Sequence, residues 1–283
     1  MLADRAAQRT FGEDSLALEA ACAEGVGLCT LVGIDGSFSR RSGAQLAVLP
    51  DGSFRGSLSS QCLEAQLAAD LASCDGPRIV RYGKGSPNID FRLPCGGGLD
   101  ILLEPRPDRV ACRRTMEALG DRRPAQLVFG DGKRRFTRRY LPHLRIVALG
   151  EGPELASVTR LCAALNIEVQ ALGKDDLALG CTPDGLRYDA WTACLLLFHD
   201  HEWEPALLRQ ALASDTFYIG AQGGERARAE RVLNLMAWGI REEDIARVTS
   251  PVGSIPNCKT PEALALSAVT EIVMHYERLH AAS

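Results

Sequence analysis

The sequence has no long apolar run, and neither sign of charge is in large excess. No stretch approaches the roughly 20 apolar residues that a membrane-spanning helix needs, and the first thirty residues lack the order of a signal peptide. The net charge of -4 and the pI near 5.8 argue against non-specific binding to nucleic acid. We therefore expect a cytoplasmic protein that binds neither nucleic acid nor a membrane.

The ten cysteines include no C-x-x-C pair, which disfavours a structural zinc site of the usual kind. Their spacing also lacks the pattern of a small disulfide scaffold, and a reducing cytosol would keep them as thiols. Most of them lie inside apolar periodic segments and are predicted to be small core residues. Examples are Cys22, Cys112, Cys162 and Cys194.

Length and composition suit a globular protein of two domains, because 283 residues with 46% hydrophobic content can bury two cores. We predict an α/β fold, with a small N-terminal α/β domain over 1–141 and a second domain over 142–283. The second half opens with an apolar strand, a glycine turn, a helix and another apolar strand. This βαβ rhythm predicts a Rossmann-like, doubly wound parallel sheet.

The run LPCGGGLDILLEP places Cys95 directly before Gly96, Gly97 and Gly98. Consecutive glycines are kept where φ must be positive or where a ligand must approach the backbone closely. A turn of exposed N–H groups suits an anion and favours the thiolate form of a neighbouring cysteine. The alternative is a tight turn with an inert, buried cysteine.

A second cysteine of interest precedes a predicted helix. Leu63, Leu67 and Leu71 repeat every four residues, which indicates a buried helix face and puts Cys62 in the first turn. There the helix dipole favours a thiolate, and Glu64 is near enough to interact with a ligand. A buried cysteine and a glutamate that only complements the dipole remain the alternative interpretation.

The first glycine turn of the second half, Gly150-Glu151-Gly152, has two glycines of a dinucleotide-binding fingerprint. The third small position holds Leu155, and the acidic residue expected later is only loosely matched by Asp175 or Asp176. Binding of NAD(P) is thus an open alternative. The later cluster HDHEWEP contains possible metal ligands, but we interpret it as a polar loop that leads into a helix.

Four segments together resemble the XdhC/CoxI family, the accessory proteins of molybdoenzymes of the xanthine dehydrogenase and carbon monoxide dehydrogenase type. They are SLSSQCLE, RYGKGSPNIDFRLPCGGGLDILLEP, FYIGAQGGERARAERVL and SPVGSIPNCKTPEALALS, and the second is the most specific. The resemblance covers nearly the whole chain. It implies an N-terminal domain that carries the two cysteines and a Rossmann-like C-terminal domain.

The same resemblance implies a molybdenum cofactor-binding chaperone rather than a catalyst. Family members bind the cofactor, protect it during sulfuration and deliver it to an apo-molybdoenzyme. The implied partners are the large subunit of xanthine dehydrogenase or a related enzyme, a cysteine desulfurase and a second copy of the chain. Two positions depart from the family pattern, because Ser60-Gln61 replaces Gly-Gly and Glu151 adds an acidic side chain that would repel a pyrophosphate.

On this basis Cys62 and Cys95 are predicted to supply thiolates near molybdenum, since a soft metal-dithiolene centre suits soft ligands. Backbone approach is assigned to the five glycines Gly83, Gly85, Gly96, Gly97 and Gly98. Phosphate contacts are assigned to Arg81, Lys84 or Arg92. Two other functions stay open: a nucleotide-dependent oxidoreductase that uses the second domain, and a structural adaptor without cofactor.

Overall fold

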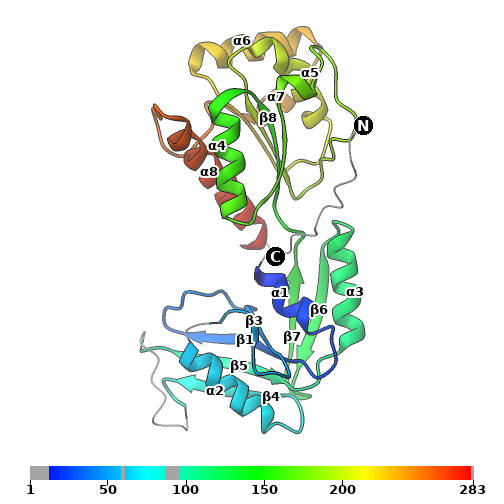
Figure 1. The fold of residues 1–283 in the computed structure, drawn as a ribbon, viewed down its shortest axis with the longest axis vertical. Helices are drawn as coiled ribbons and strands as arrows, with labels where there is room; N and C mark the ends of the chain where they lie inside the picture. Colours follow the sequence, from blue (N-terminus) through cyan, green and yellow to red (C-terminus); the bar gives the residue numbers. More distant parts are fainter. Residues whose placement is uncertain (1–12, 59–60, 87–95, 282–283) are drawn as a thin grey trace. The chain divides into compact units, whose positions relative to one another are not determined.

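The computed structural model describes residues 13–58, 61–86 and 96–281. The chain divides into two compact units, Phe11–Pro142 and His143–Ser283, called here the first and second unit (Figure 1). Within the described ranges, no helix is long and apolar enough to cross a membrane.

The first unit is built on a five-stranded sheet in which all neighbouring strands are antiparallel. Its strand order is β3-β2-β1-β5-β4. The strands are β1 (Gly27–Asp35), β2 (Gln45–Val48), β3 (Phe54–Gly56), β4 (Arg78–Gly83) and β5 (Gly98–Glu104). The order places β5, the last of these strands in the sequence, between β1 and β4.

Both faces of this sheet are covered. On one face Leu28 and Leu102 pack with helices α1 and α3 and with the hairpin β6-β7. On the other face Leu31 and Ile101 pack against α2, whose Leu63, Leu67 and Leu71 are buried as predicted. The bounds are α1 (Glu13–Ala20), α2 (Gln61–Ala72), α3 (Arg109–Gly120), β6 (Ala125–Gly130) and β7 (Arg135–Tyr140). Burial on both faces explains why β5 is apolar almost throughout.

The second unit contains a five-stranded parallel sheet in the order β12-β11-β10-β8-β9. The strands are β8 (Arg145–Gly150), β9 (Glu168–Leu172), β10 (Thr192–Leu197), β11 (Tyr218–Ala221) and β12 (Val248–Thr249). The chain winds one way from β8 to β9 and the other way from β10 onward. The winding therefore reverses between β8 and β10, which creates a topological switch point.

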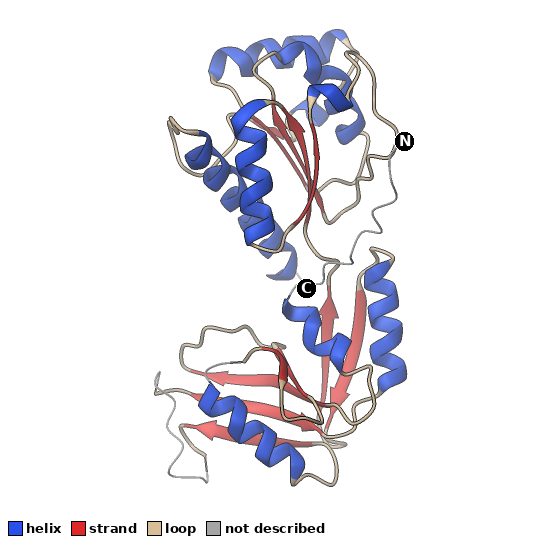
Figure 2. Cartoon of the chain, in the orientation of Figure 1, coloured by secondary structure: helices blue, strands red, loops and turns tan. Residues whose placement is uncertain are grey.

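Helices cover both faces of this parallel sheet (Figure 2). Helices α4 (Gly152–Ala164) and α8 (Pro261–Ala281) pack on one core, and α5 (Glu204–Leu212), α6 (Glu225–Ala237) and α7 (Glu242–Ile245) on the other. Short 3₁₀ turns occupy Lys174–Asp176 and His201–Trp203. The prediction of a doubly wound, Rossmann-like sheet is confirmed, while the two-residue strand β12 was not predicted.

One buried acid stands out in the first unit. Glu104 ends β5 with 8% of its surface exposed, and its Oε2 atom has no hydrogen-bond partner among the described residues. Burial raises the pKa of this carboxyl to about 7, because desolvation disfavours its charged form. The unfolded chain therefore loses this proton at lower pH than the folded chain does, and the resulting loss of stability grows as pH rises from about 4.5 to about 7.

We expect Glu104→Gln to raise the free energy of unfolding at pH 8 by roughly 3 kcal/mol, because the amide is neutral at every pH. At pH 5 the gain should be much smaller. Urea denaturation of both proteins, followed by circular dichroism at the two pH values, measures the difference. An equal effect at pH 5 and pH 8 would contradict a raised pKa for Glu104.

Candidate functional site

Cys62 lies in the first turn of α2, as predicted, and it is exposed to solvent. Three other cysteines are buried, and burial raises the pKa of the Cys112 and Cys194 thiols to about 12 and that of Cys162 to about 11. Those thiols stay protonated at neutral pH, in agreement with the prediction that they are core residues. Cys95 and Arg92 lie outside the described residues, so the arrangement of the two candidate cysteines stays a prediction.

Glu64 has a structural partner close by in the chain. Its carboxylate accepts hydrogen bonds from the backbone N–H of Leu58 and the hydroxyl of Ser57, both at 3.2 Å. Only 9% of its surface is exposed. Glu64 therefore fixes the segment that leads into α2, and its contact with a ligand stays a prediction.

Gly83 and Gly98 pair at the ends of β4 and β5 and close the base of the glycine-rich loop. Gly83, Gly85 and Gly96 have positive φ, as a glycine-rich turn requires. A Cβ on Gly98 would lie 2.3 Å from a guanidinium nitrogen of Arg81. The backbone N–H of Lys84 donates to the carbonyl of Gly97 at 2.9 Å, which ties the two sides together.

The Arg81 side chain is engaged within the protein. Its guanidinium donates to Asp35 at 3.0 Å, to Asp100 at 3.1 Å and to the Lys84 carbonyl at 2.9 Å. The Lys84 amine lies 3.8 Å from the same Asp35 carboxylate. Two carboxylates thus offset the two cations, so the base of this loop has little net charge to attract a phosphate.

Gly150 and Gly152 stand at the end of β8 and the start of α4, as predicted, and both have steric reasons to be glycine. A Cβ on Gly150 would lie 2.6 Å from the Cβ of Leu197, and Gly152 has a φ of +70°. Between them, the Glu151 carboxylate pairs with Lys174 at 3.0 Å and accepts the His199 N–H at 3.3 Å. The hydrogen bond with Lys174 lowers the pKa of Glu151, so this turn carries a stable negative charge.

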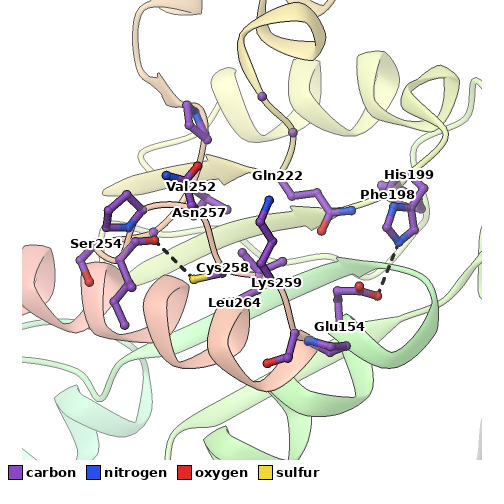
Figure 3. Close-up of a pocket in the computed structure, with 18 of the residues that line it drawn as sticks. Glu154, Phe198, His199, Gln222, Val252, Ser254, Asn257, Cys258, Lys259 and Leu264 are labelled. Atoms are coloured by element: carbon purple, nitrogen blue, oxygen red, sulfur yellow. Dashed lines mark hydrogen bonds and ion pairs between the residues drawn. The ribbon is translucent and has the colours of Figure 1, made fainter.

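The second unit has a cavity of about 640 Å³ at the carboxyl ends of its strands (Figure 3). Its walls come from the first turn of α4, the segments after β10 and β11, and the loop from Pro251 to α8. They include Glu154, Phe198, His199, His201, Gln222, Gly223, Gly224, Val252, Asn257, Cys258, Lys259 and Leu264. Gly150 and Gly152 are not among the described residues that line it.

A buried ion pair holds the walls of this cavity in place. Arg231 and Glu204 are 4% and 1% exposed, and two guanidinium nitrogens of Arg231 donate to the Glu204 carboxylate at 2.7 and 3.0 Å. Arg231 also donates to the Ser250 hydroxyl at 2.7 Å and the Gln222 carbonyl at 2.8 Å. The Nδ1 atom of His201 lies 3.0 Å from a Glu204 oxygen. One guanidinium therefore joins α5, α6 and the ends of β11 and β12.

The cluster HDHEWEP is thus a polar turn that leads into α5, as interpreted from the sequence, with one buried member. Among the described residues, no group of three or more His, Cys, Asp or Glu could hold a metal ion. Sequence reasoning missed Glu204, Arg231 and Lys259 as parts of a site. The acidic residue before Pro205 gave a weak signal at best, because its partner lies 27 residues away.

The chain is similar to known proteins in sequence and in fold. The XdhC and CoxI family model matches residues 20–83, and the XdhC Rossmann domain model matches residues 146–272. The molybdenum cofactor insertion chaperone PaoD of Escherichia coli K12 is 30% identical over 276 residues, which span 91% of this chain and 85% of PaoD. A crystal structure described as a xanthine dehydrogenase from Bacillus halodurans has a similar fold, with a TM-score of 0.71 and 19% identity over 92% of this chain and 95% of that one.

Removal of Arg231 should destabilise the second unit strongly. We expect Arg231→Met to lower the free energy of unfolding by about 3–5 kcal/mol, because Glu204 would stay buried without a partner charge. The double variant Glu204→Gln, Arg231→Met has no buried charge at this pair, so its free energy of unfolding should fall clearly less. Tryptophan fluorescence in urea follows this unit, since Trp191, Trp203 and Trp238 all lie in it.

The matched control is Arg241→Met, because Arg241 pairs with Asp244 on the exposed surface. Arg241→Met should lower the free energy of unfolding by only about 0–1 kcal/mol. If Arg231→Met and Arg241→Met unfold at the same urea concentration, the buried pair does not hold the second unit together.

Proposed function

The chain belongs to the XdhC and CoxI family, and from this premise we propose that it is a molybdenum cofactor-binding chaperone. It protects the cofactor during sulfuration and delivers it to an apo-molybdoenzyme of the xanthine dehydrogenase type. The observation that carries the proposal is the similarity to a molybdenum cofactor insertion chaperone over 91% of this chain. The role is that of a maturation factor rather than a catalyst.

Cys62 is the described residue that best fits contact with the cofactor. It is exposed at the start of a 12-residue helix, where the first N–H groups have no partner within the helix. Thiolates are soft ligands and suit a metal bound by dithiolene sulfur. We propose that Cys62 acts with Cys95, and that Gly83, Gly85 and the run Gly96–Gly98 allow the cofactor to approach the backbone.

The proposed partners follow from this role. The cofactor passes to the large subunit of a molybdoenzyme, and a cysteine desulfurase is the proposed source of sulfur. We further propose that the chain works as a homodimer in the cytoplasm.

Substitution of Cys62 tests the proposal. We expect the wild-type protein, expressed beside an intact molybdenum cofactor pathway, to copurify with molybdenum and pterin. The Cys62→Ala and Cys95→Ala variants should each retain about tenfold less molybdenum and pterin. This corresponds to a loss of about 1.4 kcal/mol in the free energy of cofactor binding. Metal analysis and the fluorescence of oxidised pterin, both per chain, give the result.

Cys181→Ala is the matched control, because Cys181 is also an exposed free cysteine but lies in the second unit. It should retain the wild-type load. If a folded Cys62→Ala, Cys95→Ala double variant keeps as much molybdenum as Cys181→Ala, the thiols do not hold the cofactor.

A further inference from the structure

The cavity of the second unit lies where parallel α/β sheets usually bind ligands. It opens at the carboxyl ends of the strands, beside the reversal of winding between β8 and β10. Its volume of about 640 Å³ is within the range of small-molecule sites. The cavity lies within the second unit and is independent of the cysteines of the first unit.

One side of this cavity is suited to an anion. Lys259 is exposed there, and in Figure 3 its amine and the Gln222 amide lie on the same side of the cavity. The Gly223-Gly224 turn opens the 13-residue helix α6, whose N-cap, Gly224, provides no side-chain hydrogen bond. The first N–H groups of a helix have no partner within it, so a phosphate can accept from them.

The His201 imidazole borders the same side of the cavity. A Cβ on Gly223 would lie 3.5 Å from His201 Nε2 and 2.7 Å from the Cβ of Ala227, so a glycine is needed to bring the turn this close. Glu204 holds the other ring nitrogen of His201, and the ion pair with Arg231 holds Glu204. The imidazole is therefore positioned beside the turn before any ligand arrives.

The opposite side of the cavity offers an acceptor. Glu154 comes from the first turn of α4, and in Figure 3 its carboxylate lies across from Lys259. Its Oε2 atom is buried and has no hydrogen-bond partner among the described residues, and His199 Nε2 lies 3.6 Å away. A buried oxygen left unpaired costs free energy that a ligand hydroxyl would recover.

Apolar side chains also line the cavity. Phe198, Val252 and Leu264 line the cavity, and Phe198 and Val252 are buried. A complementary ligand has an anionic end, a body with apolar faces and hydroxyl donors. A nucleoside monophosphate combines these three features, whereas a bare anion has only the first.

We propose that this cavity binds a nucleoside phosphate, with the phosphate at Lys259 and the N–H groups of the Gly223-Gly224 turn, and the sugar hydroxyls at Glu154. The phosphate thus lies at the turn after β11 and not at Gly150-Glu151-Gly152. At that turn the Glu151 carboxylate would repel a phosphate. Lys174, which pairs with Glu151 at 3.0 Å, is already shared with Asp200 at 3.7 Å.

Isothermal titration of the full chain tests the site with AMP, GMP, CMP and UMP, and with inorganic phosphate and adenosine as partial ligands. We expect saturable binding of at least one monophosphate, and about tenfold weaker binding of both partial ligands. Lys259→Ala should weaken the monophosphate about tenfold, because a charge-assisted contact is lost. Glu154→Gln should weaken the monophosphate but leave inorganic phosphate unchanged.

Lys133→Ala is the matched control, since Lys133 is an exposed lysine of the first unit and should have no effect. The proposal is overturned if no monophosphate binds, if inorganic phosphate binds as tightly as the nucleotides, or if Lys259→Ala binds like Lys133→Ala. Cys62→Ala should bind nucleotides like wild type. A failure of this site is thus distinct from a failure of cofactor binding at the cysteines.

Discussion

The buried ion pair between Glu204 and Arg231 is the interaction on which the cavity walls of the second unit depend. Its two side chains come from different helices. Arg231 also donates to the Ser250 hydroxyl, which follows β12, and to the Gln222 carbonyl, which follows β11. A charge removed from water must be offset by its partners, so these segments can move apart only at a high energetic cost. The geometry of His201 and of the Gly223-Gly224 turn follows from this constraint.

The two units present different chemistry. The first unit has an exposed thiol at a helix start and, separately, glycine turns beside which the charge of Arg81 is paired with Asp35 and Asp100. The second unit has a cavity with a lysine, an oriented imidazole and a buried carboxylate oxygen that has no hydrogen-bond partner among the described residues. A thiolate suits a soft metal centre, and the donors of the cavity suit a phosphate. The proposed cofactor site therefore rests on the softness of sulfur, and the proposed phosphate site rests on the charge and hydrogen-bond donors of the cavity.

Local patterns predicted the elements well, because they report local physics. The spacing of Leu63, Leu67 and Leu71 predicted α2, and all three are buried. The Asp131-Gly132 pair is typical of a hairpin turn, and it joins β6 to β7. The position of β5 between β1 and β4 and the pairing of Glu204 with Arg231 join residues distant in sequence, which no local pattern reports. For Cys62, the first-turn position followed from the sequence, while its exposure required the structure.

The two glycines of the Gly150-Glu151-Gly152 turn show why a motif alone does not define a phosphate site. Gly150 is needed because β8 and β10 approach so closely that a Cβ would meet Leu197, and Gly152 is needed for its positive φ. Both requirements belong to the strand-to-helix turn itself and hold whether or not a ligand binds. What decides the place of an anion is the charge beside the turn. At Gly150-Glu151-Gly152 that charge is the Glu151 carboxylate, and at Gly223-Gly224 the cavity contributes Lys259. For this reason we place the phosphate site at Gly223-Gly224, where the charge favours an anion. The glycine motif at Gly150-Glu151-Gly152 lies on the same carboxyl edge of the sheet but has an unfavourable charge.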